Sequence, residues 1–279
     1  MSFTDLPVEL IENVLIYCDP IEVAQCAQTC TSLRNLIYFA EDSKLWRELY
    51  LMQPFDDPRQ CISHDGTPAR EPIAWRDDLQ RIIRMRSVIT ADDGFAILKP
   101  GELKETLKTL LHLVCNVPSL TPFGDVSMNL VWVAVMLGAG FLDRLESREG
   151  KDVTERQLTG RLHTYYGITT DDAKAYKRVN SRVFVYSLPN YRPETEYGPF
   201  FSTGEVNWEH MQAIHHVVSM HLVDLQDEAE FKFPIFPLSL PFIQSTIPPE
   251  VVLDEESDWA GVAGPWSVSF CFCDHRDLL

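Results

Sequence analysis

Residues 6–18 read LPVELIENVLIYC and open a run of short amphipathic segments that decides the fold. Pro7 fits the first turn of a helix, where its missing N–H would have no helical partner anyway. The apolar side chains that follow recur at four-residue spacing, which places them on one face of a helix. They are Leu6, Pro7, Leu10, Ile11, Val14 and Leu15.

Three further helices are predicted directly after this one. Asp19, Pro20 and Glu22 form a capping-box pattern, with Asp19 as N-cap, so a second helix begins at Pro20 and ends near Thr31. The residues Leu33, Leu36, Ile37 and Ala40 follow the spacing of a third amphipathic helix, and residues 43–50 contain the pattern of a fourth. A module of this size, below about 60 residues, cannot enclose all of these apolar side chains, so part of the surface is expected to meet a partner.

These residues resemble an F-box. The likeness rests on Leu6-Pro7 with Glu9, Leu10 and Ile11, on the corner Cys18-Asp19-Pro20, on Cys30, and on Leu45-Trp46-Arg47. Cys18 stands where the family usually has leucine, and Leu33 stands near a frequent tryptophan position; both replacements are apolar.

The resemblance implies a fold, a partner and a function. It implies that residues 1–52 dock on the Skp adaptor, and through it on a cullin, while the rest of the chain recruits an unknown protein substrate for an SCF-type ubiquitin ligase. The expected adaptor-binding residues are Leu6, Pro7, Leu10, Ile11, Val14, Leu15, Leu45 and Trp46. Two alternatives stay open. The chain can act with the adaptor outside ubiquitination, or it can be an enzyme or ligand-binding protein whose helical start is fortuitous, which a deep polar pocket with converging titratable groups would favour.

Composition narrows the class of partner. The 279 residues are 45% apolar and 11% aromatic, which is enough for a folded core. A net charge of −17 argues against nucleic acid and anionic membranes as partners. The first residues lack the pattern of a signal peptide, and the seven cysteines suit a reducing compartment, so we expect the cytoplasm or nucleus.

The remaining sequence predicts a linker and a second domain. Residues 53–72 carry Pro, Asp and Gly without periodicity, so they form a linker or irregular bridge before a domain at 73–279. Helices are predicted at 75–90, 103–114, from Ser127 with a break at 138–140, from a Thr154/Gln157 capping box to Gly167, near 170, and from Asn207 to Leu225. The last is expected to turn Met211, Ile214 and Val218 inward. The apolar run 130–142 is too short to span a bilayer and is predicted as a buried helix.

The remaining predictions concern the arginines of one helix, a pair of strands and a Pro-rich segment. Arg76, Arg81, Arg84 and Arg86 lie on the helix at 75–90, where a solvated face is favoured over docking on the acidic module. Residues 181–188 have the composition of a strand, and the alternation in 266–273 offers its partner, so a small antiparallel sheet is expected near the C-terminus. The fold class is therefore mostly α: an F-box module followed by an α+β domain. The Pro-rich segment 233–249 is expected to lie extended over the surface, with a Pro-rich recognition ligand as the alternative.

The C-terminal half also shows a resemblance to known proteins, which is weaker than that of the N-terminal module. Residues 181–186, 197–200, 206–208 and 258–266 resemble the C-terminal region of a large group of fungal F-box proteins, which implies no particular substrate. In some F-box relatives a Trp-Gly motif like the one at 259–264 precedes a β-rich substrate-binding domain, but too few residues follow here for a complete barrel or sandwich.

No catalytic, cofactor or metal site is predicted. The spacings of His210, His215, His216 and His221 do not match a helical zinc pair. Cys271, Cys273 and His275 could share a strand face but lack a fourth ligand, and Cys26 and Cys30 fit small apolar filler positions. Phosphate-binding loops and the G-x-S-x-G motif do not occur, so a non-catalytic protein is expected.

Overall fold

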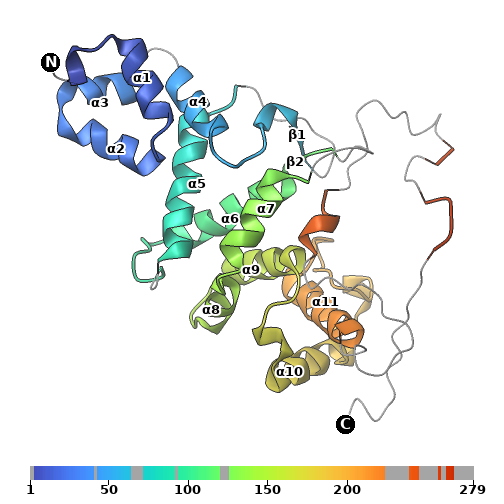
Figure 1. Ribbon diagram of the computed structural model, residues 1–279. Coiled ribbons are helices and arrows are strands. Elements are labelled where there is room, and N and C mark those ends of the chain that lie inside the picture. The colour runs from blue at the N-terminus through green and yellow to red at the C-terminus, as the bar shows by residue number, and fades with distance from the viewer. Residues whose placement is uncertain are drawn as a thin grey trace.

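The structure is a computed structural model of the chain. It describes residues 3–40, 43–63, 72–91, 94–119, 126–223, 239–244, 257–258 and 262–266, without the side chains of 221–223 and 241. Within these ranges the protein is mostly helical, which confirms the predicted fold class. Figure 1 shows the first four helices grouped at one end of the molecule, and α5 leading from them into the remaining helices.

The N-terminal module consists of four short helices that follow one another closely. They are α1 (Val8–Ile16), α2 (Pro20–Thr29), α3 (Thr31–Tyr38) and α4 (Lys44–Leu51), preceded by the single 3-10 turn η1 (Phe3–Asp5). The capping box is confirmed, because the Asp19 carboxylate accepts from the backbone N–H of Ile21 at 2.9 Å and Glu22 accepts from that of Asp19 at 3.1 Å. Pro7 differs slightly from the prediction, since it is the N-cap of α1 and not part of its first turn.

Helix α5 (Trp75–Thr90) joins the module to the rest of the chain. It packs against α4 and α2, and the ring of Trp75 meets that of Tyr50 edge to face at 5.5 Å. Arg86 and Arg76 contact the module through Asp19 and the backbone carbonyl of Tyr38, respectively. The preference for a purely solvated arginine face was therefore wrong for these two residues. A continuous cluster of buried apolar side chains runs from the module into the following helices.

The segment after α4 is ordered by contacts with residues far along the chain. It contains η2 (Pro58–Gln60) and β1 (Cys61–Ile62), which pairs antiparallel with β2 (Val117–Pro118). The carboxylate of Asp56 accepts from the hydroxyl of Ser127, the N-cap of α7 (Met128–Leu137), at 2.5 Å and from the backbone N–H of Met128 at 2.8 Å, so it satisfies donors at the start of that helix. The two-stranded antiparallel sheet thus exists, but it is not near the C-terminus.

The remaining helices form the body of the protein, which Figure 1 shows from α6 in the centre to α10 and α11 at the bottom. Apart from α5 and α7 they are α6 (Glu102–Cys115), α8 (Phe141–Ser147), α9 (Val153–Tyr166), α10 (Ala175–Val185) and α11 (Trp208–Val223). Single 3-10 turns are η3 (Asp171–Ala173), η4 (Leu188–Asn190), η5 (Pro193–Thr195) and η7 (Leu240–Phe242). Gly140, with φ of 80°, separates α7 from α8 at the predicted break. The capping box of α9 is formed by Asp152 and Glu155, two residues before the predicted one.

The predicted strand at 181–188 is wrong, because residues 181–185 belong to α10. Its β-branched and aromatic residues favour a strand locally, but Lys177, Ser181 and Phe184 recur at helical spacing and line one pocket beside α11. Contacts with α11 thus override local propensity. Of the proposed partner strand only Trp266 is described; residues 267–273 lie outside the described part of the chain.

Two further expectations need correction. The inward face of α11 carries His210, Ala213, Val217 and Met220, one residue away from the predicted face, and Val218 is exposed. In the Pro-rich segment only 239–244 are described, and there η7 replaces an extended chain, with Leu240 inserted into the core.

No single helix within the described ranges has the length and apolarity to cross a membrane, although α7 and α8 together, bent by 56°, pass that test by length and composition.

Candidate functional site

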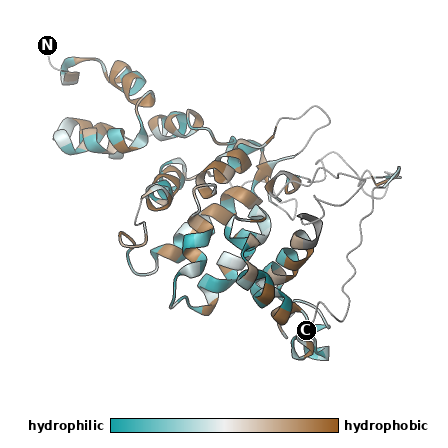
Figure 2. Ribbon diagram, turned by 60° about the horizontal axis from the view of Figure 1, so that its bottom comes forward, coloured by the Kyte–Doolittle hydropathy of each residue, from teal (hydrophilic) through white to brown (hydrophobic). Residues whose placement is uncertain are grey.

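The outer face of α1 is apolar. Leu10 and Val14 are each 49% exposed and Tyr17, directly after the helix, is 80% exposed. Their spacing of four and three residues places them on one face, and Pro7 is exposed at its start. Figure 2 shows brown apolar segments among polar ones on these N-terminal helices. We call Leu10, Val14 and Tyr17 the α1 stripe.

The structure divides the eight predicted adaptor-binding residues into two groups. Pro7, Leu10 and Val14 are exposed and Leu6 is half-buried. The other four, Ile11, Leu15, Leu45 and Trp46, are buried in the protein's own core. Trp46 also donates a hydrogen bond from Nε1 to the carbonyl of Ile37 at 2.7 Å. The contact of any of the eight with an adaptor stays a prediction, and the exposed ones are those that a partner can reach without rearrangement.

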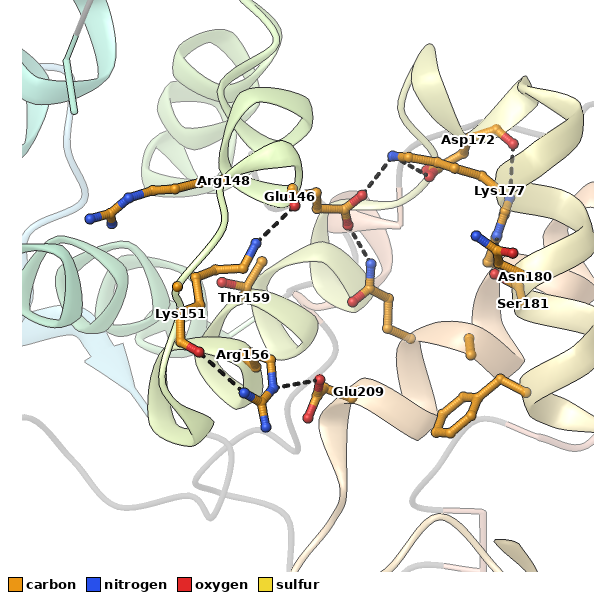
Figure 3. Close-up of a pocket in the computed structure, with 15 residues that line it drawn as sticks. Glu146, Arg148, Lys151, Arg156, Thr159, Asp172, Lys177, Asn180, Ser181 and Glu209 are labelled. Atoms are coloured by element: carbon orange, nitrogen blue, oxygen red, sulfur yellow. Dashed lines mark hydrogen bonds and ion pairs between the residues drawn. The ribbon is translucent and has the colours of Figure 1, made fainter. Parts of the chain in front are cut away.

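A second site is a polar pocket in the body of the protein. Its volume is about 680 Å³, and it lies between the α8–α9 connection, α9, α10 and α11. Figure 3 shows Lys151 and Arg156 on one side and Lys177, Asn180 and Ser181 on the other, with Glu146 between them. This size is within the range of small-molecule sites. Several titratable groups converge on it, as the ligand-binding alternative predicts, but the pocket is wide open to solvent and is not deep.

A buried imidazole lies behind this pocket. His163 is 3% exposed, and its ring is placed between two carboxylates: Nδ1 contacts Glu146, and Nε2 lies 2.9 Å from Asp172 Oδ2. Lys177 donates to Glu146 Oε2 at 2.6 Å and to Asp172 Oδ1 at 3.5 Å. The backbone N–H of Thr169 donates to Asp172 at 2.8 Å. These contacts tie α8, α9, η3 and α10 together.

The pKa values of these groups follow from their pairing. Burial acts to lower the pKa of His163, but hydrogen bonds with Asp172 and Glu146 outweigh it and raise that pKa to about 9. Burial acts to raise the pKa of Glu146, yet His163 and Lys177 bring it down to about 2. The pKa of Asp172 is lowered in the same way, against burial, by His163 and Thr169. At neutral pH the cluster therefore holds two cations, His163 and Lys177, against these two carboxylates.

Glu146, His163 and Asp172 each offer a potential metal ligand, and these atoms lie within 4.8 Å of one another. However, the two ring nitrogens of His163 face two different carboxylates, so the three groups do not converge on one point through it. Lys177 already supplies positive charge at 2.6 Å from Glu146. The arrangement fits an internal ion-pair network better than a metal centre.

The histidines of α11 have separate partners. Nε2 of His210 lies 3.2 Å from the Tyr191 hydroxyl, and Nε2 of His215 lies 3.0 Å from the Ser239 hydroxyl. Nε2 of His216 is 2.9 Å from the carbonyl of Asp172 and Nδ1 is 2.7 Å from the Ser181 hydroxyl. These three imidazoles therefore contact different groups, and the side chain of His221 lies outside the described part of the chain.

The pair of Ser181 and His216 has one element of a hydrolytic site. If Nε2 of His216 donates to the Asp172 carbonyl, Nδ1 can accept the Ser181 proton. Acyl transfer also needs donors for an oxyanion, which often are backbone N–H groups. Ser181 lies inside α10, where the backbone N–H groups are used by the helix itself. The backbone of α10 therefore supplies no oxyanion donor at Ser181.

Sequence reasoning missed the cluster around His163. Its partners lie 17 and 9 residues away in the chain and on other elements, so no spacing signals it. A histidine within the apolar pattern of a predicted helix was the one available hint, and it is an unspecific one.

Comparison with known proteins identifies the N-terminal module. Residues 3–52 match the family model described as F-box-like, and this range contains the α1 stripe. No curated protein and no solved structure matches the chain. The chain thus carries an F-box-like domain, as the sequence resemblance predicts. F-box domains bind the Skp adaptor within SCF-type complexes.

Proposed function

We propose that this protein is a non-catalytic substrate-recognition subunit of an SCF-type ubiquitin ligase. Its F-box-like domain docks on the Skp adaptor, and through it on a cullin, while the body presents a protein substrate. The observation that carries the proposal is the α1 stripe, which is exposed and apolar and lies within the residues that match the F-box-like family model.

The α1 stripe has the properties of a helix-in-groove contact. Leu10, Val14 and Tyr17 present adjacent apolar side chains from one helical face, which is the arrangement by which an amphipathic helix fits a hydrophobic groove. A few apolar and aromatic anchors at the centre of such an interface carry most of the binding energy. Burial of the neighbouring Ile11 and Leu15 in the core holds this face in position.

The link between the module and the body supports a presenting role. Packing of α5 on α4, the Arg86–Asp19 pair and the contact of Arg76 with the Tyr38 carbonyl fix the module against the body. A substrate bound to the body would then be held in a defined direction from the adaptor. The division into 1–52, 53–72 and 73–279 stays a prediction, and the substrate-binding residues are unknown.

The test is a binding assay with the purified Skp adaptor and the full chain. The double variant Leu10→Ala/Val14→Ala should weaken binding at least tenfold, since each truncation at an interface anchor costs on the order of 1–3 kcal/mol. Both side chains are exposed, so the fold should persist. Val131→Ala/Val135→Ala is the matched control, because these valines of α7 are also exposed but lie outside the F-box-like domain.

Unchanged adaptor binding by the Leu10→Ala/Val14→Ala variant would contradict the proposed docking face. A further measurement separates ubiquitination from other roles of an adaptor-bound protein. The proposal expects the cullin to co-purify with the chain and the adaptor, whereas a complex that never contains the cullin would favour a role outside ubiquitin transfer.

A further inference from the structure

The polar pocket has an excess of positive charge in a strongly acidic protein. The chain carries a net charge of −17, yet the pocket is lined by four basic side chains against three acidic ones. Each of the three acids is paired within the protein: Glu146 and Asp172 with His163 and Lys177, and Glu209 with Arg156 at 3.0 Å. The uncompensated charge therefore belongs to the other two basic residues, Lys151 and Arg148.

Lys151 is held in place without a counter-ion. Its ammonium donates to the carbonyls of Leu145 at 2.6 Å and Glu146 at 2.9 Å, at the end of α8. Within the described residues no carboxylate lies at ion-pair distance from it, although Glu146, Glu155 and Glu209 act on it at longer range, and one of its three N–H donors is left for a ligand. Partial burial lowers the pKa of this lysine, as expected for a cation that lacks a direct partner. Capping of α8 explains its position but does not neutralise its charge.

Neighbouring groups extend this basic wall. Arg156 donates from Nη1 to the carbonyl of Lys151 at 3.1 Å and from Nε to Glu209, which leaves Nη2 without a hydrogen bond to any residue that the structure describes. Arg148 lies over the ring of Phe95 at 5.7 Å, and Figure 3 shows it directed away from Lys151. Arg148 thus adds to the local potential, and Lys151 and Arg156 can contact a bound anion.

The opposite wall, on α10, offers a different chemistry. The amide of Asn180 makes no hydrogen bond to any residue that the structure describes, so it can donate to a ligand. Phe184 is 38% exposed and supplies an apolar surface to the same pocket. Ligand sites commonly combine such an apolar wall with a few polar groups that fix orientation.

We propose that this pocket binds a small organic anion. Its carboxylate or phosphate would lie at Lys151 and Arg156, and its apolar part would lie against Phe184, with Asn180 donating across the pocket. The proposal goes beyond adaptor docking and does not depend on it, because the pocket residues lie outside the F-box-like domain.

Phenylacetate and phenyl phosphate are suitable probes, since each joins one of the two anionic groups to an aromatic ring. Saturation-transfer NMR with the full chain at pH 7 should detect binding of at least one of them, and the identity of that probe shows which anion is preferred. Benzyl alcohol, which lacks the charge, should bind at least fivefold more weakly. If neither anion binds, the proposal is overturned.

Variants locate the binding. Lys151→Gln should weaken it at least fivefold and Lys151→Arg should retain it, while Lys108→Gln, an exposed lysine outside the pocket, should leave it unchanged. Because Lys151 also caps α8, Asn180→Asp gives an independent test: it adds a negative charge to the pocket at an exposed position and should abolish binding. Asn35→Asp, exposed on α3, is its control. Equal binding by folded Asn180→Asp protein would place the anion elsewhere and refute the proposal.

Discussion

Arg86 of α5 donates from Nη2 to both carboxylate oxygens of Asp19, at 2.9 and 2.8 Å. Asp19 is also the N-cap of α2, so one carboxylate both starts a helix of the F-box-like domain and binds that domain to the body. The contact joins residues 67 positions apart in the sequence.

Removal of this contact should loosen the module. Arg86→Met retains the length of the side chain but leaves Asp19 without its cation, so the free energy of unfolding should fall by about 1 kcal/mol, a value that allows for partial exposure of the pair. Urea denaturation measures it. Arg81→Met is the control, because Arg81 pairs within α5 with Asp78 and should change stability by less than about 0.5 kcal/mol. Equal effects of the two variants would argue against a special role of Arg86.

Asp56 should be important for stability although it lies in the segment predicted as a linker. Its carboxylate accepts from Ser127, Met128 and Asn129 at the start of α7. Asp56→Ala should therefore reduce the free energy of unfolding by about 1–2 kcal/mol, as loss of a helix N-cap does. Glu149→Ala, which removes an exposed carboxylate without a capping role, serves for comparison in the same thermal or urea unfolding experiment. A neutral Asp56→Ala result would mean that water replaces these contacts at little cost.

Gly160 should not tolerate a methyl group. A Cβ at this position of α9 would lie 2.6 Å from the carbonyl oxygen of Trp208, where α11 begins. Helix propensity favours alanine by about 0.5–1 kcal/mol, but the clash should dominate and Gly160→Ala should destabilise the protein by about 2 kcal/mol. Thr154→Ala on the exposed side of α9 should be nearly neutral. A stabilised Gly160→Ala protein would show that α9 and α11 can separate easily.

The cluster around His163 should make stability depend on pH. Because the pKa of His163 is raised to about 9, its contribution is complete below the unfolded value of about 6.5 and is lost as the pH rises towards 9. The loss should be on the order of 3 kcal/mol. The lowered pKa values of Glu146 and Asp172 act in the other direction, so their contribution is lost below about pH 4.

Urea unfolding at several pH values tests this expectation. Wild-type protein should lose stability between pH 6.5 and 9, whereas His163→Gln should be less stable at pH 6.5 and lack most of that loss. If the two proteins follow parallel curves over this interval, the imidazolium is not the group responsible.

The sequence predicts the helices well where local patterns and packing agree. The Asp19 capping box, the helix at 75–90 and the break at 138–140 are all confirmed. Residues 181–185 were assigned wrongly because their strand propensity opposes the helical contact with α11, and only the latter decides the structure. Sequence periodicity placed the inward face of α11 one residue off, since the true face is set by α9 and α10.

The candidate sites differ in how far the sequence could reveal them. The four-residue spacing on α1 identifies an apolar helix, but it cannot tell Leu10, which is exposed, from Ile11, which is buried in the core. The pocket could not be predicted at all. Lys151, Lys177 and Gln212 come from separate elements, and only the packing of α11 on both α9 and α10 brings them together.

The packing of α5 on α4 also determines which fragment can be studied alone. A peptide that ends at residue 52 would expose the ring of Tyr50 to water, because Phe55 and Trp75 pack against this ring in the full chain. A peptide that extends to Thr90 includes α5 and therefore keeps the contact of Trp75 with Tyr50 and the ion pair of Arg86 with Asp19. For crystallisation with an adaptor, the shortest stably folded fragment should therefore include α5.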